Sequence, residues 1–278
     1  MKYLLALFSL GFFLACEQDV SNPDWPEHEE KLVVTGFVRL QNDSMFTYCR
    51  VSRTMPLGVQ YRDEDAIINN ADILLRHDNG ALPVPYHPTA SNNPWVTSFN
   101  YTAVNTRPLS EMFQISVRSG QHQAFANQTI PDAPLSFESV ALETHPTDTW
   151  MQQLRYTIRL PEQPVDYVCV FEIRPLGSVE WIEYMTVDLY IPRDAFGRTF
   201  SGTQRVYFDP MAMIWSKRYR LIAASPEYRE YNTAIANGRW GSGGDPFEPD
   251  SKNPRFNVTG DGIGFFWVEL VGEAITIP

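Results

Sequence analysis

Side chains that could carry out catalysis or bind a metal are scattered along this 278-residue chain. The five histidines have neither the i, i+4 spacing nor the neighbouring cysteines that a zinc site needs, and no G-x-S-x-G or H-E-x-x-H motif occurs. Asp245, Glu248 and Asp250 suggest a calcium loop, but their spacing is not that of an EF-hand, and a solvated loop explains them better. We therefore expect a non-enzymatic protein with no catalytic residues, no cofactor and no bound metal.

The residue with the clearest chemistry is Cys16. Lys2 is followed by an apolar run over residues 3–15, which is too short to span a bilayer and has the length of a secretory signal peptide's hydrophobic region. The run ends at Ala15-Cys16, and polar residues follow. This arrangement resembles the cleavage box of bacterial lipoproteins, in which the cysteine becomes the lipidated first residue of the mature protein. An ordinary signal peptide cleaved elsewhere, with Cys16 incidental, is the alternative.

Residues 16–30 are polar, acidic and contain two prolines, which is typical of a flexible tether. Glu17 and Asp19 resemble the export signal that directs lipoproteins of one group of Gram-negative bacteria to the outer face of the outer membrane; a solvated linker is the alternative. Asp43-Ser44-Met45 resembles the short O-glycosylation signal of the same group, which makes Ser44 a candidate acceptor, although an ordinary turn explains it equally well.

Composition limits the classes of partner. With 33 acidic and 22 basic residues the formal charge is -11, which repels phosphate backbones, so we expect no nucleic-acid binding. The hydrophobic fraction of 44% is sufficient for packed cores. No second segment is apolar over the length of a membrane span, so the expected contact with the membrane is through the lipid alone.

Seven short strands with turn signals about every ten residues predict a β-sandwich of immunoglobulin or transthyretin type over residues 31–131. Pro131 to Pro134 form the expected boundary, because proline disfavours both helix and central strand. A second all-β domain is expected over residues 132–278, which leaves residues 1–15 as signal peptide and 16–30 as tether. The expected strands lie near residues 31–40, 46–53, 71–77, 82–86, 95–104, 112–118 and 123–130, then 137–143, 153–160, 167–174, 180–191, 204–208, 219–224, 256–259, 264–270 and 273–277.

One helix is expected, over residues 225–238. Ser225 is a candidate N-cap, Pro226 suits the first helical position, and Gly238 can end the helix in the left-handed conformation. The predicted fold class is therefore all-β, with two sandwich domains and one short helix near the C-terminus.

The alternation of side chains predicts which faces are buried. Thr47, Cys49, Val51 and Arg53 share one face of their strand, and that face could point inward. In the second domain Tyr156, Ile158 and Leu160 share a face that should be buried. Cys49 and Cys169 lie in strand patterns of different domains, which favours two buried free thiols over a disulfide.

Aromatic residues are frequent in the middle of the second domain, and most should belong to its core. The segment 192–202 lacks alternation and places Phe196 and Phe200 among turn-forming residues. These two are the candidates for contact with a partner or ligand, since aromatic side chains bring a large contact area at low entropic cost.

Six short motifs resemble the outer-membrane lipoprotein family catalogued as domain of unknown function 4249. They are KLVVTGFV (31–38), CRVSRTMP (49–56), NADILLRHDNG (70–80), FQISV with TIP (113–117 and 129–131), SPEYREY (225–231) and NVTGDGIGFF (257–266). Members of this family are typically encoded beside TonB-dependent outer-membrane receptors. The resemblance implies a location and a partner, a TonB-dependent receptor, and it supplies no catalytic residues.

Two functions follow as hypotheses. The first is an accessory lipoprotein of the outer membrane that works with a TonB-dependent receptor in nutrient uptake. The alternative is a cell-surface structural or adhesin-like module that binds other macromolecules. A hydrolase would need converging titratable groups in a pocket, and no motif indicates them. The sequence identifies neither the ligand nor the orientation toward the periplasm or the cell surface.

Overall fold

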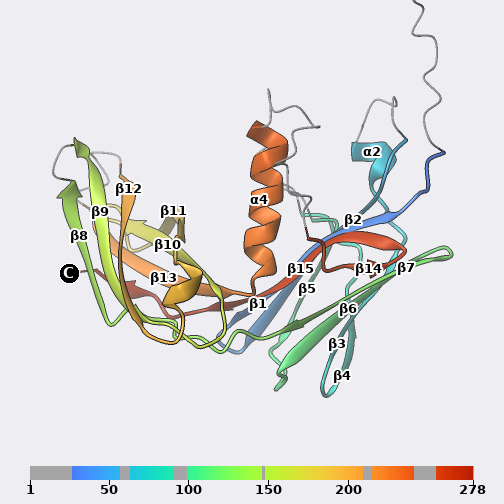
Figure 1. Cartoon of the computed structure of the whole chain (residues 1–278), viewed down its shortest axis with the longest axis horizontal. Helices are drawn as coiled ribbons and strands as arrows, with labels where there is room; N and C mark the ends of the chain where they lie inside the picture. The colour runs from blue at the N-terminus through green and yellow to red at the C-terminus, as the bar shows by residue number, and fades with distance from the viewer. Residues whose placement is uncertain are drawn as a thin grey trace, which may run out of the picture.

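The computed structural model describes residues 27–56, 63–89, 99–145, 148–208, 215–240 and 255–277 (Figure 1). The protein is all-β, with two sandwiches and one helix of several turns near the C-terminal end, which confirms the expected fold class. The strands are β1 Leu32–Gln41, β2 Ser44–Arg53, β3 Asp72–His77, β4 Gly80–Pro83, β5 Tyr101–Thr106, β6 Met112–Ser119, β7 His122–Thr129, β8 Ser139–His145, β9 Asp148–Arg159, β10 Asp166–Arg174, β11 Ile182–Leu189, β12 Thr199–Tyr207, β13 Ser216–Ala224, β14 Thr259–Gly260, β15 Gly262–Val271 and β16 Ile275–Thr276. The helical segments are α2 Asp63–Ala66, the 3-10 turn η1 Arg193–Ala195, and α4 Glu227–Trp240. The single-turn helix α2 was not expected from the sequence.

Three sheets build the fold. The long sheet has eight strands, in the order β11-β10-β13-β15-β1-β2-β5 with β16 beside β13. A five-stranded sheet in the order β14-β7-β6-β3-β4 packs on one end of it, and we call this the first facing sheet. A three-stranded sheet in the order β12-β9-β8, the second facing sheet, packs on the other end. Figure 1 shows the two facing sheets toward opposite ends of the long sheet, with α4 standing between them.

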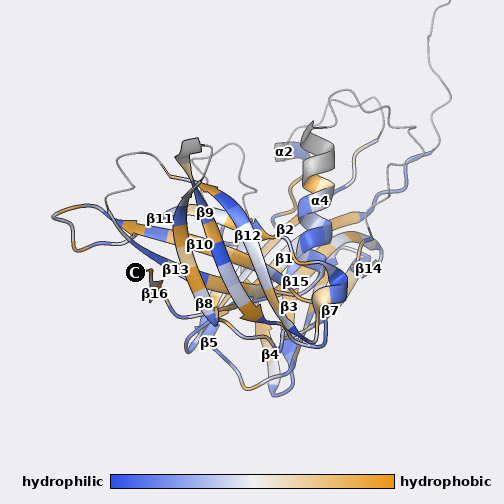
Figure 2. Ribbon diagram, turned by 60° about the vertical axis from the view of Figure 1, so that its left-hand side comes forward, coloured by the Kyte–Doolittle hydropathy of each residue, from blue (hydrophilic) through white to orange (hydrophobic). Residues whose placement is uncertain are grey.

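Each sandwich has its own core. In the first, alternate residues of β2 face inward, and Thr47, Cys49 and Val51 are fully buried, as the alternation predicted, while Arg53 is half-buried. In the second, Tyr156 and Ile158 of β9 and Leu160 just after it are buried, as predicted. Figure 2 shows the corresponding bands of hydrophobic and hydrophilic residues along the strands. A two-residue period therefore places apolar side chains correctly in both sandwiches.

Both facing sheets cover the same face of the long sheet. Leu270 of β15 packs against the first core, its register partner Ala223 of β13 belongs to the second core, and paired residues of neighbouring strands point to the same face. The alternate residues Phe265 and Trp267 point to the other face, where α4 packs. The molecule is therefore two sandwiches that share one sheet, with the helix on the opposite side.

The strands that close the first sandwich come from both ends of the described chain. β15 runs parallel to β1 over ten residue pairs, from Leu32 opposite Gly262 to Gln41 opposite Val271, and β14 pairs with β7. Both strands lie beyond the expected boundary at residue 131. The first sandwich thus combines residues 32–129 with residues 259–271.

Helix α4 begins and ends later than expected. It starts at Glu227, and Gly238 lies inside the helix. In the described part of the chain, the Ser225 hydroxyl accepts the backbone N–H of Val268 at 3.2 Å and has no hydrogen bond to the first turn of the helix. Instead, the carboxylate of Asp166 on β10 accepts the backbone N–H of Arg229 at 3.2 Å. The cap therefore comes from a strand that is distant in the sequence.

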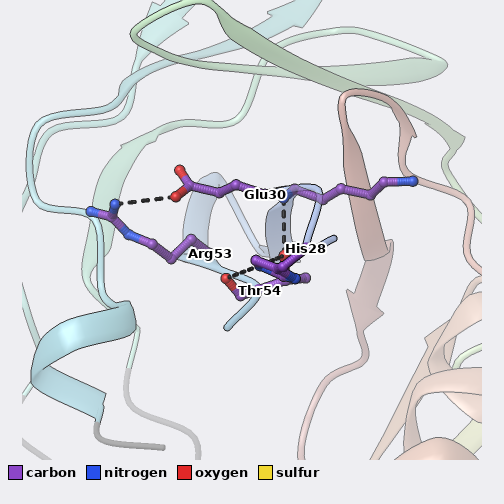
Figure 3. Close-up of polar contacts among 5 residues, drawn as sticks. His28, Glu30, Arg53 and Thr54 are labelled. Atoms are coloured by element: carbon purple, nitrogen blue, oxygen red, sulfur yellow. Dashed lines mark hydrogen bonds and ion pairs between the residues drawn. The ribbon is translucent and has the colours of Figure 1, made fainter. Parts of the chain in front are cut away.

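The last residues of the expected tether contact the first sandwich (Figure 3). His28 Nε2 lies 3.1 Å from the backbone oxygen of Thr54, and the backbone N–H of Lys31 donates to Thr54 Oγ1 at 3.0 Å. Arg53 Nη1 lies 3.5 Å from Glu30 Oε2. These exposed contacts hold the chain against the end of β2 just before β1 begins.

Candidate functional site

Of the residues that the sequence singled out, Ser44 lies in the first sandwich, whereas Phe196 and Phe200 lie in the second. Cys16 lies outside the described residues, as do the three acidic residues of the expected solvated loop. Ser44 is the first residue of β2 and is half-buried after the turn at Asn42 and Asp43. Nothing in this geometry tests lipidation or glycosylation, which stay predictions.

Phe196 and Phe200 are half-buried rather than projecting. Both pack against the second core, and the Phe200 ring lies 6.3 Å from the ring of Tyr156. Phe200 lies in β12, in a stretch that the sequence analysis treated as non-alternating, and Phe196 directly follows η1. A partner would reach only part of either ring, so their role in contact stays a prediction.

Cys49 and Cys169 are free and fully buried, each in a different sandwich. This confirms the expectation of two buried thiols. Burial raises the pKa of both thiols well above the ordinary value, because a thiolate would lack solvation there. Both side chains act as small apolar core residues.

The hairpin between β10 and β11 presents apolar side chains that were not among the residues expected to contact a partner. Leu176 and Val179 are each 88% exposed, and Ile182 at the start of β11 is 51% exposed. The Ser178 N–H donates to the Pro175 oxygen at 3.0 Å, and Gly177 between them has φ +82°, as the third position of a type II turn requires. A leucine in a tight turn and a valine directly after it, where polar residues are usual, were the signal that could have identified this tip.

The base of this hairpin is held by aromatic and ionic contacts. The Trp181 ring contacts two guanidinium groups, that of Arg174 at 5.0 Å and that of Arg218 at 4.4 Å from the ring centroid. Glu172, which is buried, forms ion pairs with Arg218 and with Arg220, the latter at 2.9 Å. The hairpin base is therefore fixed against β13, and the apolar tip projects from β11, which is an edge strand of the long sheet.

Helix α4 stands on aromatic residues of the long sheet. The Tyr231 ring stacks on Trp267 with centroids 4.8 Å apart, and the Tyr228 hydroxyl donates to Asp188 Oδ1 at 3.0 Å. Arg229 Nη2 pairs with Asp166 Oδ1 at 2.7 Å. Burial raises the pKa of Asp166 to about 6, although the Arg229 guanidinium and backbone N–H act in the opposite direction. These contacts fix the orientation of the helix. Asp166, Asp188 and Arg229 are therefore occupied in holding the helix on the long sheet.

The comparisons with protein-family models and with curated proteins found no match. Among the described residues, His, Cys, Asp and Glu side chains do not gather in groups of three that could hold a metal ion. Of the helices in the ranges given above, none has the length and apolarity that crossing a bilayer requires.

Proposed function

We propose that this chain is a non-enzymatic lipoprotein of the bacterial outer membrane that assists a TonB-dependent receptor in nutrient uptake. The support for the anchor is the amino-terminal sequence: an apolar run that ends at Cys16, followed by an acidic, proline-containing segment. Lipidation of Cys16 would attach the double sandwich to the membrane through residues 16–30. In this arrangement the protein faces the cell surface, and the periplasmic face is the alternative.

The observation that carries the partner contact is the apolar tip of the β10–β11 hairpin. Leu176 in the turn and Val179 directly after it are almost fully exposed, and neighbouring Ile182 is half-exposed, so the three form a local apolar surface. Burying such side chains against a partner is favourable by about 1.5–3 kcal/mol for each that becomes fully buried. Because the hairpin base is already fixed by Trp181 and the Glu172 ion pairs, the hairpin would lose little conformational entropy on binding.

Receptor contact is tested by co-purification from detergent-solubilised membranes. The double variant Leu176→Asn with Val179→Asn should reduce the recovered TonB-dependent receptor at least tenfold, by the loss of about 1.4 kcal/mol or more of binding energy. Leu109→Asn is the matched control, because Leu109 is 90% exposed in a loop away from the hairpin. If the unaltered protein recovers no TonB-dependent receptor, or if the control loses it equally, the proposed partnership is wrong.

The anchor is tested separately by mass spectrometry of the purified mature protein. A diacyl or triacyl group on Cys16 is the expected result, and Cys16→Ala should release the protein from the membrane fraction. An unmodified thiol at position 16, or a different first residue, would contradict the anchor. Protease treatment of intact cells distinguishes the cell-surface orientation from the periplasmic one.

Growth of a deletion strain separates nutrient uptake from an adhesin-like role. The accessory function predicts a defect on particular nutrients, with normal attachment to surfaces and other cells. A strain that grows normally on every nutrient tested but attaches poorly would favour the adhesin-like module instead.

A further inference from the structure

The outer face of the first facing sheet is hollowed into a groove. Its cavity volume is about 580 Å³, and its walls come from β3, β4, β6 and β7. The inner face of the same strands packs on the long sheet, and alternate residues of β3, β6 and β7 point away from that core into the groove. It lies on a different sheet from the β10–β11 hairpin.

Strand register places the groove residues in rows. In the middle row Leu74 lies opposite Ser116, and Ser116 lies opposite Phe125. The small serine therefore forms the floor, between an aliphatic and an aromatic side chain. Phe125 lines the groove and is 38% exposed, so part of its ring is open to a ligand. Tyr86, which is 45% exposed, lines the groove as well and is held by an edge-to-face contact with Tyr101 at 5.4 Å.

Two arginines lie at the two ends of this floor. Arg118 pairs in register with Asp72 in one outer row, and Arg76 pairs with Gln114 in the other. The two rows are four residues apart along β3, which corresponds to about 13 Å at about 3.3 Å per residue. No carboxylate of the described residues lies within ion-pairing distance of either guanidinium, so both charges are available to a ligand.

Arg118 is also held in position. With the Gln123 amide oxygen directed toward it, Nε and Nη2 of Arg118 both donate to that oxygen at 2.9 Å. Gln123 in turn is fixed through its backbone N–H, which donates to Asp261 Oδ2 at 3.0 Å. The remaining N–H groups of Arg118 are left for a ligand, and a guanidinium fixed in this way loses little entropy when it binds.

We propose that this groove binds an acidic oligosaccharide, a chain of sugar rings that carries carboxylate groups. The two guanidiniums outnumber the single carboxylate of Asp72, so the groove is locally positive on a chain whose net charge is -11. The exposed parts of Phe125 and Leu74 suit the C–H faces of sugar rings, while Ser116 and Gln114 can bond to hydroxyl groups. The two rows that carry the arginines are about 13 Å apart along the strands, a spacing that suits an extended chain with carboxylates on more than one ring. The site does not depend on the receptor contact.

Titration calorimetry on the full mature chain in detergent tests this site. The probe is trigalacturonate, and its methyl ester is the matched neutral ligand of the same shape. The acid should bind saturably and at least tenfold more tightly than the ester, because charge-assisted hydrogen bonds are strong. Arg118→Gln should weaken binding about tenfold, and Arg76→Gln should weaken it several-fold. Raising the salt concentration should weaken it further.

Arg107→Gln is the control, because it removes the same charge from an exposed loop position outside the groove. It should change the affinity less than about twofold. Absence of saturable binding up to about 10 mM ligand would overturn the proposal, because a dissociation constant above that concentration means less than about 2.7 kcal/mol of binding energy. Equal affinity for the methyl ester, equal losses in Arg107→Gln and Arg118→Gln, or equally tight binding of a single-stranded oligonucleotide would also overturn it. Circular dichroism establishes that each variant is folded.

Discussion

Replacing Gly264 by alanine should strongly destabilise the protein, because at this glycine the backbone of β1 lies too close to β15 to leave room for a Cβ atom. Gly264 pairs in register with Val34 and has φ +133°. A Cβ atom at this position would overlap the carbonyl oxygen of Val34 and would lie 2.8 Å from its carbonyl carbon. β1 cannot move away easily, since it is hydrogen-bonded to β15 on one side and to β2 on the other.

The size of the effect can be separated into two parts by a matched control. Gly177 also has a positive φ, of +82°, but nothing lies within 4 Å of a Cβ built there. Gly177→Ala therefore measures the conformational cost alone, about 1–2 kcal/mol. Gly264→Ala adds the displacement of two central strands to that cost, so we expect a total of more than about 4 kcal/mol. This is a large share of a typical domain's stability of about 5–15 kcal/mol.

Urea denaturation of both variants, followed by tryptophan fluorescence, provides the measurement. The urea concentration at the midpoint of unfolding should fall far more for Gly264→Ala than for Gly177→Ala. The dependence of the unfolding free energy on urea concentration should be similar in both. Recovery of only unfolded Gly264→Ala, alongside folded Gly177→Ala, would agree with the expectation. If the free energies of unfolding of the two variants lie within about 1 kcal/mol of each other, the close approach of β15 to β1 adds no cost to a side chain at position 264, and the reasoning is wrong.

Two further predictions concern titratable groups. Because the pKa of Asp166 is about 6 in the folded state against 3.8 for the free side chain, the folded state binds more protons between these pH values. The free energy of unfolding, measured relative to Asp166→Asn, should therefore fall by about 1–3 kcal/mol as pH rises from about 4 to about 7, and then level off; a rise with pH would contradict the burial argument. Cys49 and Cys169 should resist Ellman's reagent in the native protein and react as two thiols in denaturant, because both are buried and free. A rapid reaction of either thiol in the native protein would contradict their burial, and the absence of reactive thiols after unfolding would contradict their being free.

Strand positions and buried faces were predictable because they depend on neighbouring residues. The alternation in β2 and β9 placed Cys49, Val51, Tyr156 and Ile158 in the cores correctly. The apolar hairpin tip was missed, since Leu176 and its neighbours lie between two expected strands and follow no periodic pattern. The candidate contact at Phe200 was placed in a non-alternating stretch, and the structure has a regular strand there.

The sequence by itself determined the all-β class, the approximate strands, the helix near the C-terminal end and the two buried thiols. Only the tertiary structure decided that β15 lies parallel to β1, that both sandwiches share one sheet, and that Asp166 rather than Ser225 caps α4. The reason is physical. A two-residue period is set by each strand's own side chains, whereas strand pairing uses backbone hydrogen bonds that every strand can make. Which strands become neighbours, and which distant side chain reaches a helix end or a groove, therefore depends on how the whole chain packs.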